Sequence, residues 1–213
     1  SAPATTAADS TAPSSPTVNP SNGSTITGTA EAGAVVTVKD SSGKVIGSAT
    51  AASNGAFSVT PTTPPADGAT ISVVATDPAG NASQPATATI DATPPATPKV
   101  NPTDGSPITG TAEAGAVVTI TDDKGVLIGS TTAASNGVYS FTPTRPPANG
   151  VVIKVVASDA AGNTSKPATA VVDGTPPTPT VNLTKGSPIT CTSEPDSVVT
   201  VTDSKGNLIG STT

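Results

Sequence analysis

The sequence predicts an all-β fold of tandem sandwiches, and three observations lead to this prediction. Valine and isoleucine alternate with polar residues in short runs, which is the period of a half-buried strand. Turn residues interrupt these runs about every 8 to 12 positions, as is typical of sandwich architectures. The whole pattern then repeats, because ITGTAEAGAVVTV at Ile26 returns as ITGTAEAGAVVTI at Ile108, 82 residues later.

The repeat divides the chain into successive units. A third copy of the motif, ITCTSEPDSVVTV, begins at Ile189, and self-similarity at a fixed period indicates a repeat architecture. We expect a linker from a preceding repeat over 1–15, complete repeats over 16–92 and 93–174, and a truncated third repeat over 175–213. The sequence contains no Met and begins and ends inside repeated material, so we expect a piece of a longer polypeptide.

Seven candidate strands fit within one repeat. Seven short antiparallel strands in about 80 residues are typical of an immunoglobulin-like sandwich. We therefore expect tandem seven-stranded immunoglobulin-like β-sandwiches arranged as a rod. In the first repeat the strands are expected over 17–19, 25–29, 34–39, 45–50, 56–60, 70–76 and 86–90.

The alternation also predicts the core. Successive side chains of a strand point to opposite faces, so every second residue packs against the other sheet. A domain of this size buries only about 60% of its unfolded surface, so each repeat should be marginally stable. The expected core residues are Val36, Val38, Ile46, Phe57, Val59, Ile71, Val73 and Ala75 in the first repeat, and Val118, Ile120, Ile128, Tyr139, Phe141, Ile153, Val155 and Ala157 in the second.

Composition and charge argue against several classes of function. The chain has a net charge of −6, only nine Lys and Arg residues and no basic cluster, which argues against nucleic acid as a partner. No apolar run approaches the roughly 20 residues that span a bilayer, so we expect no membrane insertion. There is no His to serve as a base, which argues against an enzyme. The single Cys191 cannot complete a zinc site and is expected to be a buried small residue.

Acidic residues gather at one end of each predicted sandwich. If consecutive strands run up and down, the incoming linker, the loop after the second strand and the loop before the last strand share that end. Carboxylates so close together repel one another, and calcium accepts irregular coordination by oxygen ligands. The sequence therefore predicts calcium at the junctions between repeats. The candidate ligands are Asp9, Glu31 and Asp77 for the first repeat, Asp91, Glu113 and Asp159 for the second, and Asp173, Glu194 and Asp196 for the third.

A purely structural role for some of these residues stays open. Asp77 and Asp159 each precede a short turn that ends in Asn81 or Asn163, and an aspartate in that position can cap the turn through the backbone. The two Asn side chains could instead complete a metal shell. The DxDxDG spacing of an EF-hand loop does not occur, so the metal prediction depends on the expected geometry alone.

Three motifs together resemble a known family. They are GTAEAGAVVTV from Gly28, SDAAGN from Ser158 and the linker VDGTPP around Asp173. The combination is similar to the bacterial immunoglobulin-like repeats of giant surface adhesins, including biofilm-associated proteins. The resemblance covers both complete repeats and the partial third, which departs from the pattern in having Cys191 where the second repeat has Gly110. It implies an extracellular location on the bacterial cell surface, with calcium at the junctions.

The resemblance and the predicted sites together indicate a structural stalk. Such a calcium-rigidified rod would project a distal binding domain of an adhesin and support biofilm formation or cell adhesion. Its partners would be the neighbouring repeats of the same chain and, between cells, homophilic contacts.

The alternative is a ligand-binding module for a host glycan or protein. Carbohydrate sites usually need exposed aromatic rings, whereas Phe57, Tyr139 and Phe141 are all predicted to point inward. The truncated third repeat lacks its later strands, so we expect it to be disordered or to borrow strands from another molecule.

Overall fold

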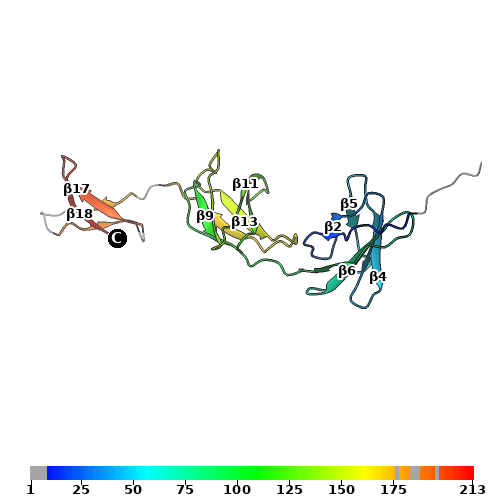
Figure 1. Ribbon diagram of the computed structural model, residues 1–213. Helices are drawn as coiled ribbons and strands as arrows, with labels where there is room; N and C mark the ends of the chain where they lie inside the picture. The colour runs from blue at the N-terminus through cyan, green and yellow to red at the C-terminus, as the bar shows by residue number, and fades with distance from the viewer. Residues whose placement is uncertain (1–8, 176–177, 183–187, 195–196) are drawn as a thin grey trace, which may run out of the picture.

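The computed structural model describes residues 9–175, 178–182, 188–194 and 197–213 (Figure 1). Its regular elements are all β-strands, which form two complete sandwiches and a smaller C-terminal unit. Figure 1 shows the first two repeats end to end, with β6 in one and β13 in the next. The predicted all-β fold of tandem immunoglobulin-like sandwiches is confirmed. The described residues include no apolar helix of membrane-spanning length.

In the first repeat a three-stranded sheet packs against a four-stranded sheet. All pairings are antiparallel, with the order β1-β2-β5 in the smaller sheet and β4-β3-β6-β7 in the larger. The seven strands agree with the predicted ranges to within one residue at each end. Their bounds are β1 (Thr17–Val18), β2 (Ile26–Thr29), β3 (Val35–Lys39), β4 (Val45–Thr50), β5 (Ala56–Val59), β6 (Thr70–Thr76) and β7 (Ala86–Thr89).

The second repeat has the same topology. Its sheets have the orders β12-β9-β8 and β11-β10-β13-β14, again with antiparallel pairing between the strands, and an isolated parallel bridge joins Thr103 to Val172. The bounds are β8 (Lys99–Val100), β9 (Ile108–Thr111), β10 (Val117–Asp122), β11 (Leu127–Thr132), β12 (Val138–Phe141), β13 (Val152–Ser158) and β14 (Ala168–Val171).

The tight turn between β3 and β4 shows how local chemistry ends a strand. The Asp40 Oδ1 atom accepts hydrogen bonds from the Ser42 amide at 2.9 Å, the Ser42 hydroxyl at 2.6 Å and the Lys44 amide at 3.0 Å. The Ser42 hydroxyl is the main cause that lowers the pKa of Asp40. Gly43 has a φ of 85°, a left-handed conformation that glycine adopts without steric cost.

The core of the first repeat follows the predicted alternation. All eight predicted residues are buried, and strand-end residues that the prediction omitted, Ile26 and Ile90, join them. Phe57 is 4% exposed and lies among the aliphatic side chains of both sheets. Burial of these side chains is the main stabilising contribution available to a domain this small.

The second core differs from the prediction at Ile128 and Phe141, which are only partly buried. Phe141 occupies the position of the smaller Val59, and its ring lies against Gly129, where an added Cβ would overlap it. The larger ring fills the end of the sandwich without being fully covered. Ile128 lines an open pocket of about 420 Å³ at the same end. Alternation therefore predicted the correct face of the sheet but not the depth of burial.

The described residues of the C-terminal unit form two small sheets, so the predicted disorder is wrong for them. β15 pairs with β16, and β17 pairs with β18, each in antiparallel fashion. Pairing with another molecule stays a prediction. The strands are β15 (Thr180–Val181), β16 (Cys191–Thr192), β17 (Val199–Thr202) and β18 (Leu208–Thr212).

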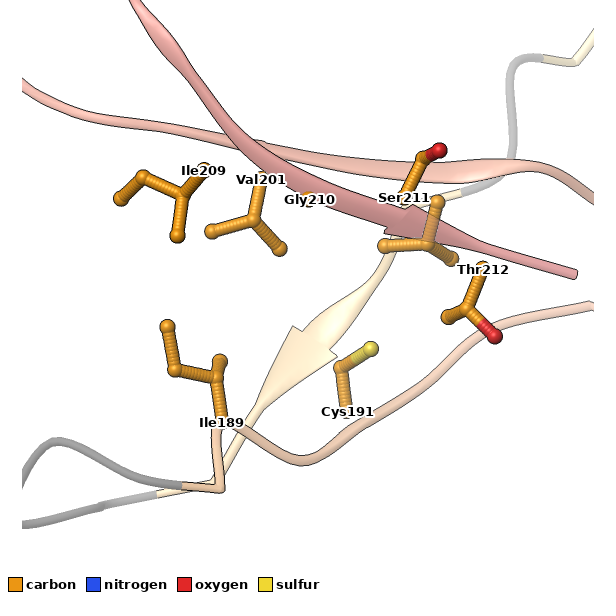
Figure 2. A pocket seen from close by; sticks show the side chains of 8 residues that line it. Ile189, Cys191, Val201, Ile209, Gly210, Ser211 and Thr212 are labelled. Atoms are coloured by element: carbon orange, nitrogen blue, oxygen red, sulfur yellow. The ribbon is translucent and has the colours of Figure 1, made fainter.

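Several apolar side chains of this unit, including Ile189, Val201 and Ile209, line an open pocket of about 480 Å³ (Figure 2). Ile189 and Ile209 are 38% and 59% exposed, whereas Ile108, the equivalent of Ile189, is fully buried in the second repeat. Cys191 is half-buried and borders the same pocket. The prediction that Cys191 is buried is therefore wrong, because no described strand pairs with β16 as β12 pairs with β9 in the second repeat, where Tyr139 lies beside Gly110.

Candidate functional site at the junction of the repeats

A pocket of about 280 Å³ lies where the first repeat meets the second. Antiparallel strands bring the exit of β7, the loop between β1 and β2, and two loops of the second repeat to this place. One part of its lining comes from Pro20, Ser21, Thr89 and Asp91, and the other from Glu113, Ala114, Gly115, Ala116, Asp159, Ala160 and Ala161.

The three acids predicted for this junction all line the pocket. Asp91 comes from the linker, Glu113 from the loop between β9 and β10, and Asp159 from the loop between β13 and β14. Asp91 and Glu113 are exposed, and Asp159 is half-buried. Residues separated by as many as 68 positions in the sequence thus share one cavity wall.

The three carboxylates do not form a preformed metal centre. Among the residues that the structure describes, no group of three or more Asp, Glu, His or Cys side chains is close enough to hold a metal ion. The donor set still consists entirely of oxygen atoms, which suits a hard cation such as calcium. The pocket therefore fits calcium in its chemistry, and binding would require the exposed side chains to move toward the ion.

The loop between β13 and β14 is held by its own aspartate. Asp159 Oδ1 accepts a hydrogen bond from the Asn163 amide at 2.9 Å, and Asp159 Oδ2 accepts one from Asn163 Nδ2 at 2.7 Å. The aspartate thus caps its own turn, as the structural alternative anticipated.

The first repeat contains the same capped loop between β6 and β7. Asp77 accepts hydrogen bonds from the Asn81 amide at 2.8 Å and from Asn81 Nδ2 at 2.7 Å. Asp77 is buried, and the Asn81 side chain is the main cause that lowers its pKa. Asn81 Nδ2 also donates to the main-chain carbonyl of Asp9 at 3.1 Å. Asp9 and Glu31 have exposed side chains at the same end of this repeat.

The linker is also bonded to the first repeat, through a residue that we did not predict. Asp67 lies in the loop between β5 and β6 and accepts hydrogen bonds from the Ala92 amide at 2.7 Å and the Thr93 hydroxyl at 2.9 Å. In the second repeat Asn149 takes this place: its Oδ1 atom accepts a hydrogen bond from the Gly174 amide at 3.1 Å, and its Nδ2 group donates one to the Thr175 hydroxyl at 2.8 Å. The sequence does carry a signal for this contact, because a polar residue recurs at the same place in PPADG and PPANG.

The candidate ligands of the third repeat are less closely associated in the described residues. Asp173 is exposed, and its Oδ1 atom accepts a hydrogen bond from the Thr175 amide at 3.0 Å. Glu194 is exposed, and its carbonyl accepts a hydrogen bond from the Ser197 hydroxyl at 2.7 Å. Asp196 lies outside the described residues.

Comparison with known proteins gives the following matches. The chain covers 29% of the length of a solved biofilm-associated protein BSP domain, with 75% of this chain aligned, 24% identity and a TM-score of 0.35. The FN1-FN3 domains of chicken CNTN1 align with 76% of this chain and 65% of their own, at 14% identity and a TM-score of 0.46. Fibronectin(III)-like modules of Clostridium thermocellum CbhA align with 75% of this chain and 88% of their own, at 20% identity and a TM-score of 0.36.

The search of curated proteins found no match. The family model of the bacterial Ig domain matches the chain twice, over residues 12–92 and 94–174. The two matched ranges include every strand of both complete sandwiches, and the resemblance to bacterial immunoglobulin-like repeats is confirmed. The chain belongs to the bacterial Ig domain family.

Proposed function

We propose that the chain is a non-enzymatic stalk segment of a bacterial cell-surface adhesin, in which calcium stiffens the junctions between repeats. The observation that supports this most strongly is the junction pocket, which is lined by Asp91 of the linker and by Glu113 and Asp159 of the second repeat. A rod of such repeats would project a distal binding domain away from the cell and support biofilm formation or adhesion. The two tandem matches to the bacterial Ig domain family agree with an extended array of repeats.

Calcium would act through charge and geometry. The three carboxylates of the pocket bring like charges to one place, and a divalent cation would supply the opposite charge. Because Asp91 belongs to the linker and the other two acids to the second repeat, a shared ion would restrict rotation between the units. The Asp91 carbonyl, the Asp159 turn and the linker prolines already limit the positions that the ligands can take.

Calcium binding would also stabilise the folded chain. At about 1 mM calcium and an assumed dissociation constant of about 0.1 mM, mass action adds roughly 1.4 kcal/mol per site. Folded domains are stable by only about 5–15 kcal/mol, so this contribution would be about a tenth to a quarter of the total.

The placement of the aromatic side chains gives no support to the alternative of a glycan-binding module. Phe57 and Tyr139 are 4% and 1% exposed, and Phe141 packs over Gly129. Stacking on a sugar requires a ring face that is open to solvent. Homophilic contacts between rods remain part of the proposal without an assigned surface.

Calorimetric titration with calcium tests the metal site. The Asp91 Oδ1 atom accepts a hydrogen bond from the Thr93 amide at 3.1 Å. The variant Asp91→Asn removes the charge of this side chain but keeps an oxygen that can accept the same hydrogen bond. The variant Asp203→Asn removes one charge in the turn between β17 and β18, outside the junction. We expect binding by the wild type and by Asp203→Asn, and a loss of about tenfold or more in affinity for Asp91→Asn, equivalent to about 1.4 kcal/mol. An equal affinity in all three proteins, or no binding in any, would contradict the calcium site.

A further inference from the structure

The peptide groups of Asp91 are hydrogen-bonded to both repeats. The Asp91 amide donates to the Ser21 carbonyl of the first repeat at 3.1 Å. The Asp91 carbonyl accepts a hydrogen bond from Asn163 Nδ2 of the second repeat at 2.8 Å. A single linker residue therefore connects the two sandwiches without any metal.

The rest of the linker has little freedom on either side of this residue. Asp67 of the first repeat bonds Ala92 and Thr93, while Pro95 and Pro98 are buried. Proline also holds its own φ near −65°. Rotation of one repeat against the other is therefore confined to the few bonds between Thr93 and Pro95.

The Asn163 side chain is held in the orientation that this contact needs. Asn163 is 8% exposed, and its Nδ2 group donates one hydrogen bond to Asp159 and one to the Asp91 carbonyl. Reversal of the amide would bring its oxygen against these two acceptors. We call this pair of hydrogen bonds the Asn163 bridge.

A second contact joins the two repeats beside the bridge. The Asn22 amide, in the loop between β1 and β2, donates to the Ala161 carbonyl at 3.2 Å. Ala161 belongs to the same loop as Asn163, so the loop between β13 and β14 contacts both the linker and the body of the first repeat. Two points of contact restrict rotation more than one alone.

We infer that the Asn163 bridge sets the orientation of the second repeat relative to the first, independently of metal. The bridge gives the proposed calcium site a framework, because the Asp91 backbone and the Asp159 side chain are placed by it before any ion binds. Asn163 is a positioning residue in this inference and not itself a calcium ligand.

The first repeat supplies a matched control. Asn81 makes the same two hydrogen bonds through Nδ2, to Asp77 and to the Asp9 carbonyl, at the opposite end of the first repeat from Asp91. Loss of the Asn81 contacts should weaken a similar loop without affecting the junction at Asp91.

The test measures the distance between spin labels on the two repeats by pulsed electron double resonance. Labels are attached to cysteines introduced at the exposed, equivalent positions Ser48 and Ser130, in a Cys191→Ser background of the full chain. In EDTA, we expect the parent and Asn81→Ala to give a single narrow distance peak. We expect Asn163→Ala to lose that peak in favour of a broad distribution.

A second variant tests whether any broadening in Asn163→Ala comes from misfolding. Asn163→Asp keeps the size of the side chain but lacks the amide donor, and it should broaden the distribution in EDTA while circular dichroism shows that the sheets are retained. A peak as narrow as that of the parent in both Asn163 variants would overturn the inference.

Calorimetric titration of the same samples with calcium keeps this inference apart from the proposed function. If the parent binds no calcium but Asn163→Ala still broadens the distance distribution in EDTA, the bridge stands and the calcium proposal fails. If the Asn163 variants match the parent in EDTA while the parent binds calcium, the bridge fails and the calcium proposal stands.

Discussion

Asn163 donates a hydrogen bond from its side-chain amide to the main-chain carbonyl of Asp91, 72 residues earlier, at 2.8 Å. Asn81 and Asp9 are related in the same way, again across 72 residues, at 3.1 Å. In each of the two complete repeats the loop before the last strand is therefore hydrogen-bonded to the linker that enters that repeat. Because of this hydrogen bond, the linker belongs to the folded repeat and is not a flexible connection.

The Asp67 contacts predict how substitutions affect the linker. Asp67→Ala should increase the hydrogen-exchange rate of the Ala92 amide, because that amide loses its acceptor. Asp67→Asn should retain most of the protection, since Asn149 makes the equivalent contacts in the second repeat. Exchange measured by nuclear magnetic resonance checks both variants, and equal protection in Asp67→Ala and the wild type would show that the contact does not hold the linker.

Because of Tyr139, we expect the stability of the second repeat to depend on alkaline pH in a way that the stability of the first repeat does not. Burial raises the pKa of its hydroxyl to about 12, from an ordinary value of about 10. Because the folded state favours the neutral form, this stabilising contribution is fully present below about pH 10 and is lost as the pH rises through about 12. Phe57 occupies the same position in the first repeat and cannot ionise.

The variant Tyr139→Phe tests this account. At neutral pH it should lose about 1 kcal/mol, because the Tyr139 hydroxyl donates a hydrogen bond to the Lys99 carbonyl. Above about pH 10 its free energy of unfolding should fall less steeply than that of the wild type. Urea denaturation at several pH values measures both effects, and parallel curves for the two proteins would refute the role assigned to the hydroxyl.

Gly28 is expected to tolerate no side chain. An added Cβ would overlap the Thr17 carbonyl oxygen and lie 2.8 Å from the Phe57 ring. Gly28→Ala should therefore destabilise the first repeat by about 1–3 kcal/mol or more. Gly210→Ala is the control, because no atom lies within 4 Å of its added Cβ, and it should change stability by less than about 0.5 kcal/mol. Thermal unfolding distinguishes them, and a neutral Gly28→Ala would contradict the packing described here.

The turn that contains Asp40 is expected to lose stability at acidic pH. Its pKa is lowered, mainly by the Ser42 hydroxyl, so its stabilising effect is present above its ordinary pKa of about 4 and is lost as the pH falls through the lowered value. Proton titration of the carboxyl by nuclear magnetic resonance should give a pKa below the ordinary value. Replacing the hydroxyl in Ser42→Ala should raise that pKa, whereas an unchanged pKa would assign the effect to other groups.

The sequence predicted the strands and most of the core because alternation is a local property. Val36 and Val38 point inward whatever the rest of the chain does. Ile128 shows the limit, since it is only partly buried whereas its equivalent in the first repeat, Ile46, is 5% exposed, and this difference depends on packing between strands.

At the junction, too, the topology could be predicted from the sequence but the side-chain contacts could not. Antiparallel topology was enough to bring Asp91, Glu113 and Asp159 to one pocket. The Asn163 bridge could not be derived from it, because that contact depends on the orientation of a side-chain amide and on the path of the linker backbone. The separation of the carboxylates likewise depends on loop conformation, which spacing in the sequence does not specify.

We infer from the Asn163 bridge that the first two repeats are held in one mutual orientation. Residual dipolar couplings of the backbone amides, measured for the full chain with calcium present, test it most directly. We predict that a single alignment tensor describes both repeats. Two tensors of different magnitude or direction would show that the repeats reorient independently, and would contradict the account.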